Sequence, residues 1–390
     1  MRRLDLQPGL RPPARAAARA AARPVILIHV PEVLHPLVVQ VLPVAVFLLA
    51  ITVTAEIAQL AGVFDVAAHA MARRARHRVV LLWLLFALLA VVSTIVMSLD
   101  TTAVLLTPVG LAIARQTGIA PMPFALTTLW VANTGSLLLP VSNLTNLLAV
   151  HRFEDLGASH GDYVRTAALP AITAIVATLV LIAILQRRAL RGTYAVDPPA
   201  EPHDRVLLVI AGVVSVAIGP LFAVGVEPAV VSVAAAAVLL IATLWRAPGL
   251  LREVRPPWLM AGAFLLVAGL LRAAQTEGLL DWLAPAVGTG TRPIDLLHLS
   301  GASAVAANLV NNLPAYLVVE PAASDDVRRL VATLVGVNAG ALVTPWASLA
   351  TLLWLQRCRS AGLQVPLLRL AGWGAVCAVV CVTAATLTIR

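Results

Sequence analysis

The chemically most informative residues of this chain are amides and hydroxyls set in very apolar sequence. The segment NTGSLLLPVSNLTNLL, residues 133–148, combines three asparagines with serine, threonine, glycine and proline. Unpaired polar groups are costly in hydrocarbon, so these side chains must face protein or a water-filled cavity. Gly135 permits unwound backbone and Pro140 removes a backbone donor, so we expect a helix that breaks here. A broken helix exposes amides and carbonyls that can hold an ion or a polar solute.

The same pattern recurs in the second half of the chain. Residues 338–353, NAGALVTPWASLATLL, align with 133–148 at an offset of 205, with asparagine, glycine and proline in matching places. Two further pairs align in the same order, 59–65 with 275–281 at an offset of 216 and 101–108 with 307–314 at an offset of 206. This near-constant separation predicts two related halves.

Two shorter polar stretches, 98–108 and 306–314, are flanked by apolar runs that are too short for two full spans. They predict re-entrant hairpins whose tips meet at the membrane midplane. Asp100 is the carboxylate of the first tip, and an ionisable group at membrane depth is a functional candidate, here for proton exchange. Asp100 could equally cap the helix of the second hairpin arm, and the two roles are compatible.

The elements that position these groups are transmembrane helices. Of 390 residues, 60% are hydrophobic and 12% charged, with a mean hydropathy of +0.92, whereas soluble domains are roughly 45–50% apolar and about 25% charged. Several apolar segments reach the roughly 20 residues that cross a bilayer as helix, and they lack the alternation of barrel strands. We therefore predict an all-α polytopic protein of the inner membrane.

The net charge of +9 comes from arginines gathered at the ends of apolar stretches, which marks topology and not nucleic-acid binding. The clusters expected in the cytoplasm are 72–78, 186–191 with Arg205, 245–255 and 356–362. Counting crossings between them gives the two halves opposite orientations. Inverted repeats with matching broken segments predict a secondary transporter whose site lies between the halves.

The predicted organisation follows from these assignments. Residues 1–23 form a disordered basic tail, 24–190 a first repeat abbreviated at its start, 191–205 a cytoplasmic linker and 206–390 a second repeat. Glu56 aligns with Arg272, so the two could form a charge pair, or each could reach separately to the membrane surface.

Other classes of function find little support in the sequence. Cys377 and Cys381 are one helical turn apart and are expected to fill the core, and the histidines show no metal-ligand spacing. The chain has no phosphate-binding loop of nucleotide hydrolases, no HExxH motif and no nucleophile with a neighbouring base in the apolar segments. We therefore expect no enzyme activity, no cofactor and no bound metal.

The polar segments together resemble the arsenical pump membrane protein family, within the ion transporter superfamily that also contains the divalent anion:sodium symporters. The resemblance covers residues 45–388 and rests on SLDTTAVLLTP, NTGSLLLPVSNLTNLL, NLVNNLP and NAGALVTPWASLATLLWL. It implies proton-coupled efflux of arsenite or antimonite, in some members with a separate ATPase subunit. The candidate substrate- and ion-binding residues are Asp100, Thr101, Thr102, Asn133, Thr134, Gly135, Ser136, Ser142, Asn143, Asn308, Asn311, Asn312, Asn338, Gly340, Thr344 and Ser348.

The chain departs from that family's pattern at several positions. Asn133 and Asn338 stand where the pumps usually carry acidic residues, and Leu99 and Leu342 stand where they carry asparagine and lysine. Uptake of a carboxylate or inorganic anion with sodium or protons is therefore the alternative within the same architecture. A non-transporting membrane subunit is the alternative from another class. The expected partners are the lipid bilayer, the anion or metalloid and the coupling ion, with a homodimer and an ATPase subunit left open and no nucleic acid.

Overall fold

The computed structural model describes residues 42–96, 98–195, 204–223, 226–256 and 287–390, with 258–259, 261–262, 265–266 and 269–270. These residues form helices and connections, and the described part of the chain contains no strand, only an isolated bridge between Arg78 and Thr193. The predicted all-α class is confirmed. The predicted tail 1–23, the start of the first repeat, the segment 275–281 and Arg272 lie outside the described residues.

The first half contains seven longer helices and two 3₁₀ turns within its described part. Gly62 adopts a left-handed conformation with φ 88°, which glycine tolerates without strain, and the chain bends by 66° at this point. The elements are α2 (Leu42–Leu60), α3 (Val63–Arg74), α4 (Val79–Val96), α5 (Leu99–Thr117), α6 (Met122–Thr134), η2 (Gly135–Leu137), η3 (Pro140–Ser142), α7 (Leu144–Asp155) and α8 (His160–Leu185).

The second half repeats the final part of this order. Its described elements are α9 (Arg205–Ala223), α10 (Pro228–Arg246), η4 (Pro248–Arg252), α13 (Pro293–Val310), α14 (Asn312–Val319), η5 (Glu320–Ala322), α15 (Val327–Ala339), α16 (Leu349–Ser360) and α17 (Leu367–Thr386). The bounds of α15 and α16 lie 205 positions beyond those of α6 and α7 at both ends. The sequence repeat therefore corresponds to a repeat of helix boundaries.

The hairpins match at a different offset from the one the sequence alignment gave. The bounds of α13 lie 214 positions beyond those of α4, and α14 begins 213 positions after α5. The alignment of 101–108 with 307–314 at 206 is thus wrong as a structural equivalence, because it matches a proline of the long helix α5 to one near the start of the short helix α14. Under the structural offset, Thr94 corresponds to Asn308.

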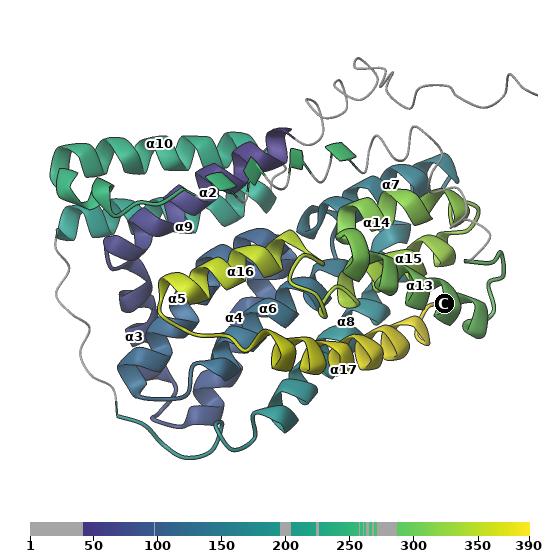
Figure 1. Ribbon diagram of the computed structural model, residues 1–390, viewed down its shortest axis with the longest axis horizontal. Coiled ribbons are helices and arrows are strands. Elements are labelled where there is room, and N and C mark those ends of the chain that lie inside the picture. The colour runs from purple at the N-terminus through teal and green to yellow at the C-terminus, as the bar shows by residue number, and fades with distance from the viewer. Residues whose placement is uncertain are drawn as a thin grey trace, which may run out of the picture.

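The helices form a side bundle and a central core (Figure 1). Helices α2, α9 and α10 pack on one another, and α2 also contacts α5. In the core, α5 packs against α6 and α16, while α14 packs against α7, so the second arm of each hairpin contacts the other half. Helix α17 lies along α8 and α13.

Four helices among the described residues are long and apolar enough to cross a bilayer, namely Val79–Val96, His160–Leu185, Pro228–Arg246 and Leu367–Thr386. With the bent pair α2–α3 this indicates a multi-pass membrane protein. Helix α4 is one of the four, so the first arm of the first hairpin is longer than the sequence suggested. The re-entrant character of the hairpins and the inverted orientation of the halves stay predictions.

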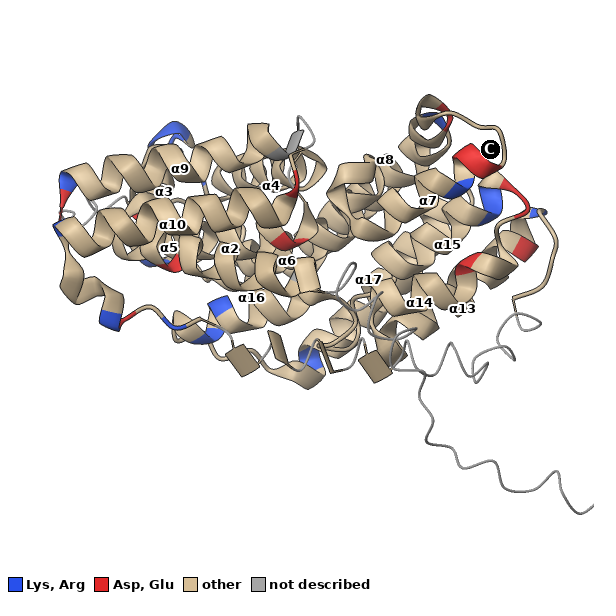
Figure 2. Ribbon diagram, turned by 90° about the horizontal axis from the view of Figure 1, so that it is seen from above, with Lys and Arg blue, Asp and Glu red and all other residues tan. Residues whose placement is uncertain are grey.

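Charged residues lie mostly at helix ends and connections (Figure 2). The arginine clusters are linked in pairs: backbone bonds join Val79 to Gly192 and Tyr194 to His77, and Arg246 pairs with Asp204 at 2.9 Å. These links place the joined clusters beside one another, and the cytoplasmic side of all four clusters stays a prediction.

Candidate functional site

The first break lies between α6 and α7, as predicted. Asn143 caps α7 by accepting from the Thr145 backbone N–H at 3.2 Å. Asn146 Nδ2 donates to the carbonyl oxygens of Ser136 (2.6 Å) and Leu139 (3.1 Å). These bonds satisfy carbonyl groups where the helix unwinds, and the Leu139 carbonyl also accepts from the Ser142 backbone N–H at 3.1 Å. The segment therefore supplies its own amides to hold the break open.

Two other side chains tie the first break to neighbouring elements. The Ser142 hydroxyl donates to the Ile95 carbonyl at the end of α4, at 2.7 Å, and the Thr134 hydroxyl donates to the Trp130 carbonyl and accepts from Thr178 on α8. The break is thus fixed against the first hairpin and against α8.

The second break lies between α15 and α16 and is held by Asn308 of the second hairpin. Asn308 Nδ2 donates to the carbonyl oxygens of Ala304 and Gly340, and Oδ1 accepts from the backbone N–H groups of Val343 (2.9 Å) and Thr344 (3.1 Å). Its amide is fully used inside the protein. Asn308 therefore positions the break, and its side chain has no donor free for a substrate.

Close backbone contact accompanies these bonds. A Cβ placed on Gly340 would lie 2.4 Å from the Ala304 Cβ on α13, so only glycine lets the two helices approach this closely. The Thr344 hydroxyl donates to the Asn308 carbonyl at 2.8 Å, and Ser348 caps α16 by accepting from the Thr351 N–H. The second break is therefore tied to its own hairpin by hydrogen bonds and close packing.

Asn338 joins the two halves. Its Nδ2 donates to Asn146 Oδ1 at 2.8 Å, and its Oδ1 accepts from Asn143 Nδ2 at 2.9 Å and from the Thr145 hydroxyl at 3.0 Å. The four side chains form what we call the amide junction. All are at most 4% exposed, so the junction is closed to solvent in this conformation.

Asn133 occupies the corresponding position in the first half but makes different contacts. Its Nδ2 donates to the Leu129 carbonyl of its own helix at 2.9 Å, and the Asn133 carbonyl accepts from the Ser136 hydroxyl at 2.8 Å. Its Oδ1 is buried and has no hydrogen-bond partner. A buried acceptor without a donor costs free energy unless a ligand or water satisfies it, so Asn133 has an acceptor available.

The first hairpin tip places Asp100 in the first turn of α5. Ser98 is the cap of that helix, because its hydroxyl oxygen accepts from the Thr101 N–H at 3.1 Å. The prediction that Asp100 caps the helix is therefore wrong: it stands two positions past the cap, and its Oδ1 is buried without a hydrogen-bond partner. Thr101 and Thr102 are buried, and both form hydrogen bonds with neighbouring hydroxyl groups.

The second hairpin tip turns at Asn311, which has φ 104°, a backbone conformation that residues other than glycine rarely adopt. Asn311 Nδ2 donates to the Trp346 carbonyl at 2.9 Å, and the Asn312 backbone N–H donates to the Ala347 carbonyl at 2.8 Å. The tip and the second break thus hold each other in place.

Two ion pairs involve arginines near the ends of α7 and α16. Arg152 pairs with Glu320 at 2.5 Å, and Arg357, which is 205 positions further on, lies 3.5 Å from Glu56. Glu56 also accepts from the Arg255 backbone N–H. The described partner of Glu56 is therefore Arg357, where the sequence had suggested Arg272.

The structure thus brings Asn143 and Asn338 into contact, uses Asn308, Asn311 and Ser142 for positioning, and leaves acceptors free on Asp100 and Asn133. Two members of the amide junction, Thr145 and Asn146, were missed by sequence reasoning. Both lie inside the polar segment 133–148, and their spacing from Asn143 was the available signal.

Comparison with known proteins shows the family of this chain. The family model described as "Citrate transporter" matches residues 16–351. The chain is 27% identical over 321 residues to an arsenical pump membrane protein of Escherichia coli, covering 75% of this chain and 73% of that protein. It is 24% identical over 348 residues to a 46 kDa membrane protein of Mycobacterium leprae, covering 82% and 79%. The matched family, the duplicated broken helices and the apolar spans lead to one conclusion: this chain belongs to the citrate transporter family and is a multi-pass membrane transporter related to the arsenical pump proteins.

Proposed function

We propose that this transporter exports arsenite or antimonite in exchange for protons. The observation that carries the proposal is the chemistry around the two breaks: amide and hydroxyl groups, one carboxylate and, in the described residues of the junction and hairpin tips, no cationic side chain. Trivalent arsenic and antimony are neutral hydroxides in neutral water. Their hydroxyl groups both donate and accept, which matches amide oxygens and nitrogens.

Recognition of a neutral hydroxide would use the free acceptors. Asn133 Oδ1 and Asp100 Oδ1 are buried without hydrogen-bond partners, so each can accept from a substrate hydroxyl. Opening the amide junction would free the donors of Asn143 and Asn338 for the substrate oxygens. The relatives named arsenical pump membrane proteins support this substrate class.

Proton coupling is assigned to Asp100. A carboxylate in the first turn of a helix, within an apolar segment, can bind and release a proton as the surroundings alternate between the two sides of the membrane. The Asp100 side chain is neutral when protonated and anionic when deprotonated, and the anionic form accepts more strongly from a hydroxyl donor. Export and proton entry would therefore be linked through one side chain.

A carboxylate is the second candidate substrate, because four capped helix N-termini, those of α5, α7, α14 and α16, begin at the hairpin tips and breaks. Helix N-termini favour anions. The family model described as citrate transporter supports this alternative. A multiply charged carboxylate would, however, have Asp100 as a like charge and no arginine at the junction as a counter-charge.

Accumulation of arsenite in cells without their own exporter tests the proposal. Cells that express this protein are expected to hold less arsenite than empty cells, and a protonophore is expected to remove the difference. Asp100→Asn should abolish proton-driven export at unchanged membrane abundance, whereas Glu154→Gln, an equal charge change at an exposed site of α7, should not. Unchanged arsenite with protein confirmed in the membrane would reject metalloid export.

A further inference from the structure

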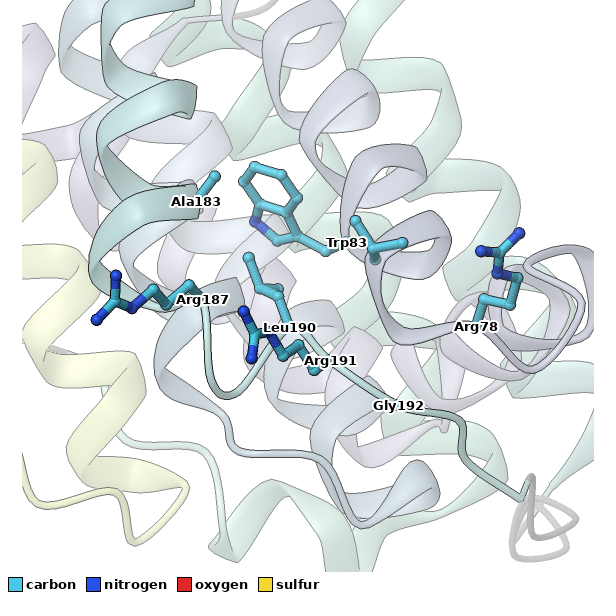
Figure 3. Close-up of a pocket in the computed structure, with 8 residues that line it drawn as sticks. Arg78, Trp83, Ala183, Arg187, Leu190, Arg191 and Gly192 are labelled. Carbon is cyan, nitrogen blue, oxygen red and sulfur yellow. The ribbon is translucent and has the colours of Figure 1, made fainter.

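A basic pocket lies apart from the transport site, between the start of α4 and the end of α8. It has a volume of about 370 Å³ and is lined by Arg78, Val80, Trp83, Ala183, Arg187, Leu190, Arg191 and Gly192. Figure 3 shows Arg187 and Arg78 on opposite sides of Trp83, with Arg191 between them. Three arginines therefore stand along the rim of a pocket whose other lining residues are apolar.

The pocket is built by fixed contacts. The Val79 N–H donates to the Gly192 carbonyl and the Tyr194 N–H to the His77 carbonyl, which fastens the segment after α8 to the start of α4. The Tyr194 hydroxyl donates to the Ala72 carbonyl at 2.7 Å. The two rims of the pocket are thus held at a set separation before any ligand binds.

The charge of the pocket is uncompensated. The lining contains no acidic residue, and none of Arg78, Arg187 and Arg191 forms an ion pair with an acidic side chain in the described part of the chain. Guanidinium groups bind phosphate oxygens through paired hydrogen bonds. Three unpaired arginines around one cavity therefore fit a phosphate group.

The walls continue into surfaces that suit acyl chains. Along α4, Val80, Leu84 and Leu88 follow one another at four-residue spacing and are 41–61% exposed. Along α8, the exposed side chains at the same spacing are Ile184, Val180 and Val176. Each row begins beside the pocket and runs along its helix toward the membrane interior, so an attached lipid tail would meet apolar surface.

We propose that this pocket binds the phosphate headgroup of an anionic phospholipid. Guanidinium groups of the rim bind the phosphate oxygens, Trp83 and Leu190 support the glycerol region, and the acyl chains lie along α4 and α8. Basic pockets between membrane helices are suited to such headgroups. The proposal does not depend on which solute the transporter carries.

Thermal unfolding of the purified full-length protein tests this site. Phosphatidylglycerol is expected to raise the Tm, and phosphatidylcholine of the same chain length is expected to raise it less. In the double variant Arg187→Gln/Arg191→Gln, the phosphatidylglycerol concentration that gives the half-maximal shift should increase roughly tenfold or more, because each arginine strengthens the attraction to an anionic headgroup. Arg188→Gln, an exposed neighbour outside the pocket, should bind as the wild type does.

A second variant tests the opposite rim of the pocket, so that the result does not depend only on the end of α8. Arg78→Gln, on the opposite rim, should weaken phosphatidylglycerol binding in the same direction, and native mass spectrometry should show less co-purified anionic lipid in it. Equal binding by wild type and both pocket variants would overturn the proposal. An equal Tm rise with inorganic phosphate alone would also overturn it, because the ligand would then be free phosphate and not lipid.

Discussion

The two broken helices have matching bounds and different hydrogen bonds. In the second half, Asn308 of the hairpin bonds to Gly340, Val343 and Thr344 of the break. In the first half, the corresponding hairpin residue, Thr94, bonds to Ala90 of its own helix and to Thr102, and the break is held mainly by Asn146. The second break is thus bonded to its own hairpin, whereas the amide side chains of the first break bond to the other half.

This difference indicates which part moves as one body and which contacts break during transport. The second break and its hairpin can move as one body, because the bonds of Asn308 lie within that body. The first break depends on Asn338 from the other half for two of its amides. Relative movement of the halves would therefore break the amide junction first and expose its donors to a solute.

The largest expected effect comes from the pair Asn338 and Asn133. Asn338→Ala removes three side-chain bonds and leaves Asn143 and Asn146 with buried groups unpaired, which should cost roughly 2–4 kcal/mol and abolish transport. Asn133→Ala removes only a bond to its own helix, so the protein should stay folded and bind substrate more weakly. Thermal unfolding and arsenite flux measured on both variants check this, and equal loss of stability would contradict the difference between the halves.

The next effect concerns the hairpins. Asn308→Ala should lower the free energy of unfolding by about 2–3 kcal/mol, because backbone groups of Gly340, Val343 and Thr344 lose their side-chain partner. Thr94→Ala, the corresponding change in the first half, should cost about 1 kcal/mol. Denaturant unfolding in the same detergent measures both values. A Thr94→Ala cost as large as that of Asn308→Ala would show that both hairpins fix their breaks alike.

The smallest expected effect concerns the starts of α6 and α15. Asp326 caps α15 by accepting from the Arg328 N–H at 2.7 Å, whereas Pro121, the corresponding residue before α6, has no side-chain cap. Asp326→Ala should destabilise by about 1 kcal/mol, and Pro121→Ala by less.

The Asp326 cap should also depend on pH. Hydrogen bonds from Arg328 hold the pKa of Asp326 below its usual range. The contribution of the cap is therefore full above the usual aspartate pKa and is lost as the pH falls through the lowered value. Unfolding curves of wild type and Asp326→Ala should converge in acid, and a constant difference down to low pH would exclude this assignment.

The positions of the breaks could be predicted from sequence because they depend on local chemistry. Glycine, proline and asparagine affect the backbone conformation within a few residues. Segments 133–148 and 338–353 therefore predicted where α6 and α15 end. The partners could not be predicted in the same way. Whether Glu56 meets Arg272 or Arg357, and whether Asn338 meets Asn146, depends on how distant helices pack, which no local pattern encodes.

At the first hairpin tip, the sequence likewise did not determine which residue caps the helix. Asp100 had the residue type of a helix cap, and so did Ser98 two positions earlier. The helix begins at Leu99, so Ser98 takes the cap and Asp100 keeps an unpaired oxygen. Ser98 therefore has the structural role of helix cap, and Asp100, two residues later, has the role in proton coupling that we propose.

Flux into proteoliposomes tests the central claim most directly. Purified protein is reconstituted, a pH gradient is imposed, and arsenite and citrate movement are followed separately, with Asp100→Asn and Glu154→Gln vesicles beside the wild type. We expect arsenite movement against the proton flow, lost in Asp100→Asn, kept in Glu154→Gln and unaffected by excess citrate. Citrate flux without arsenite flux, or arsenite flux that survives Asp100→Asn, would contradict the account.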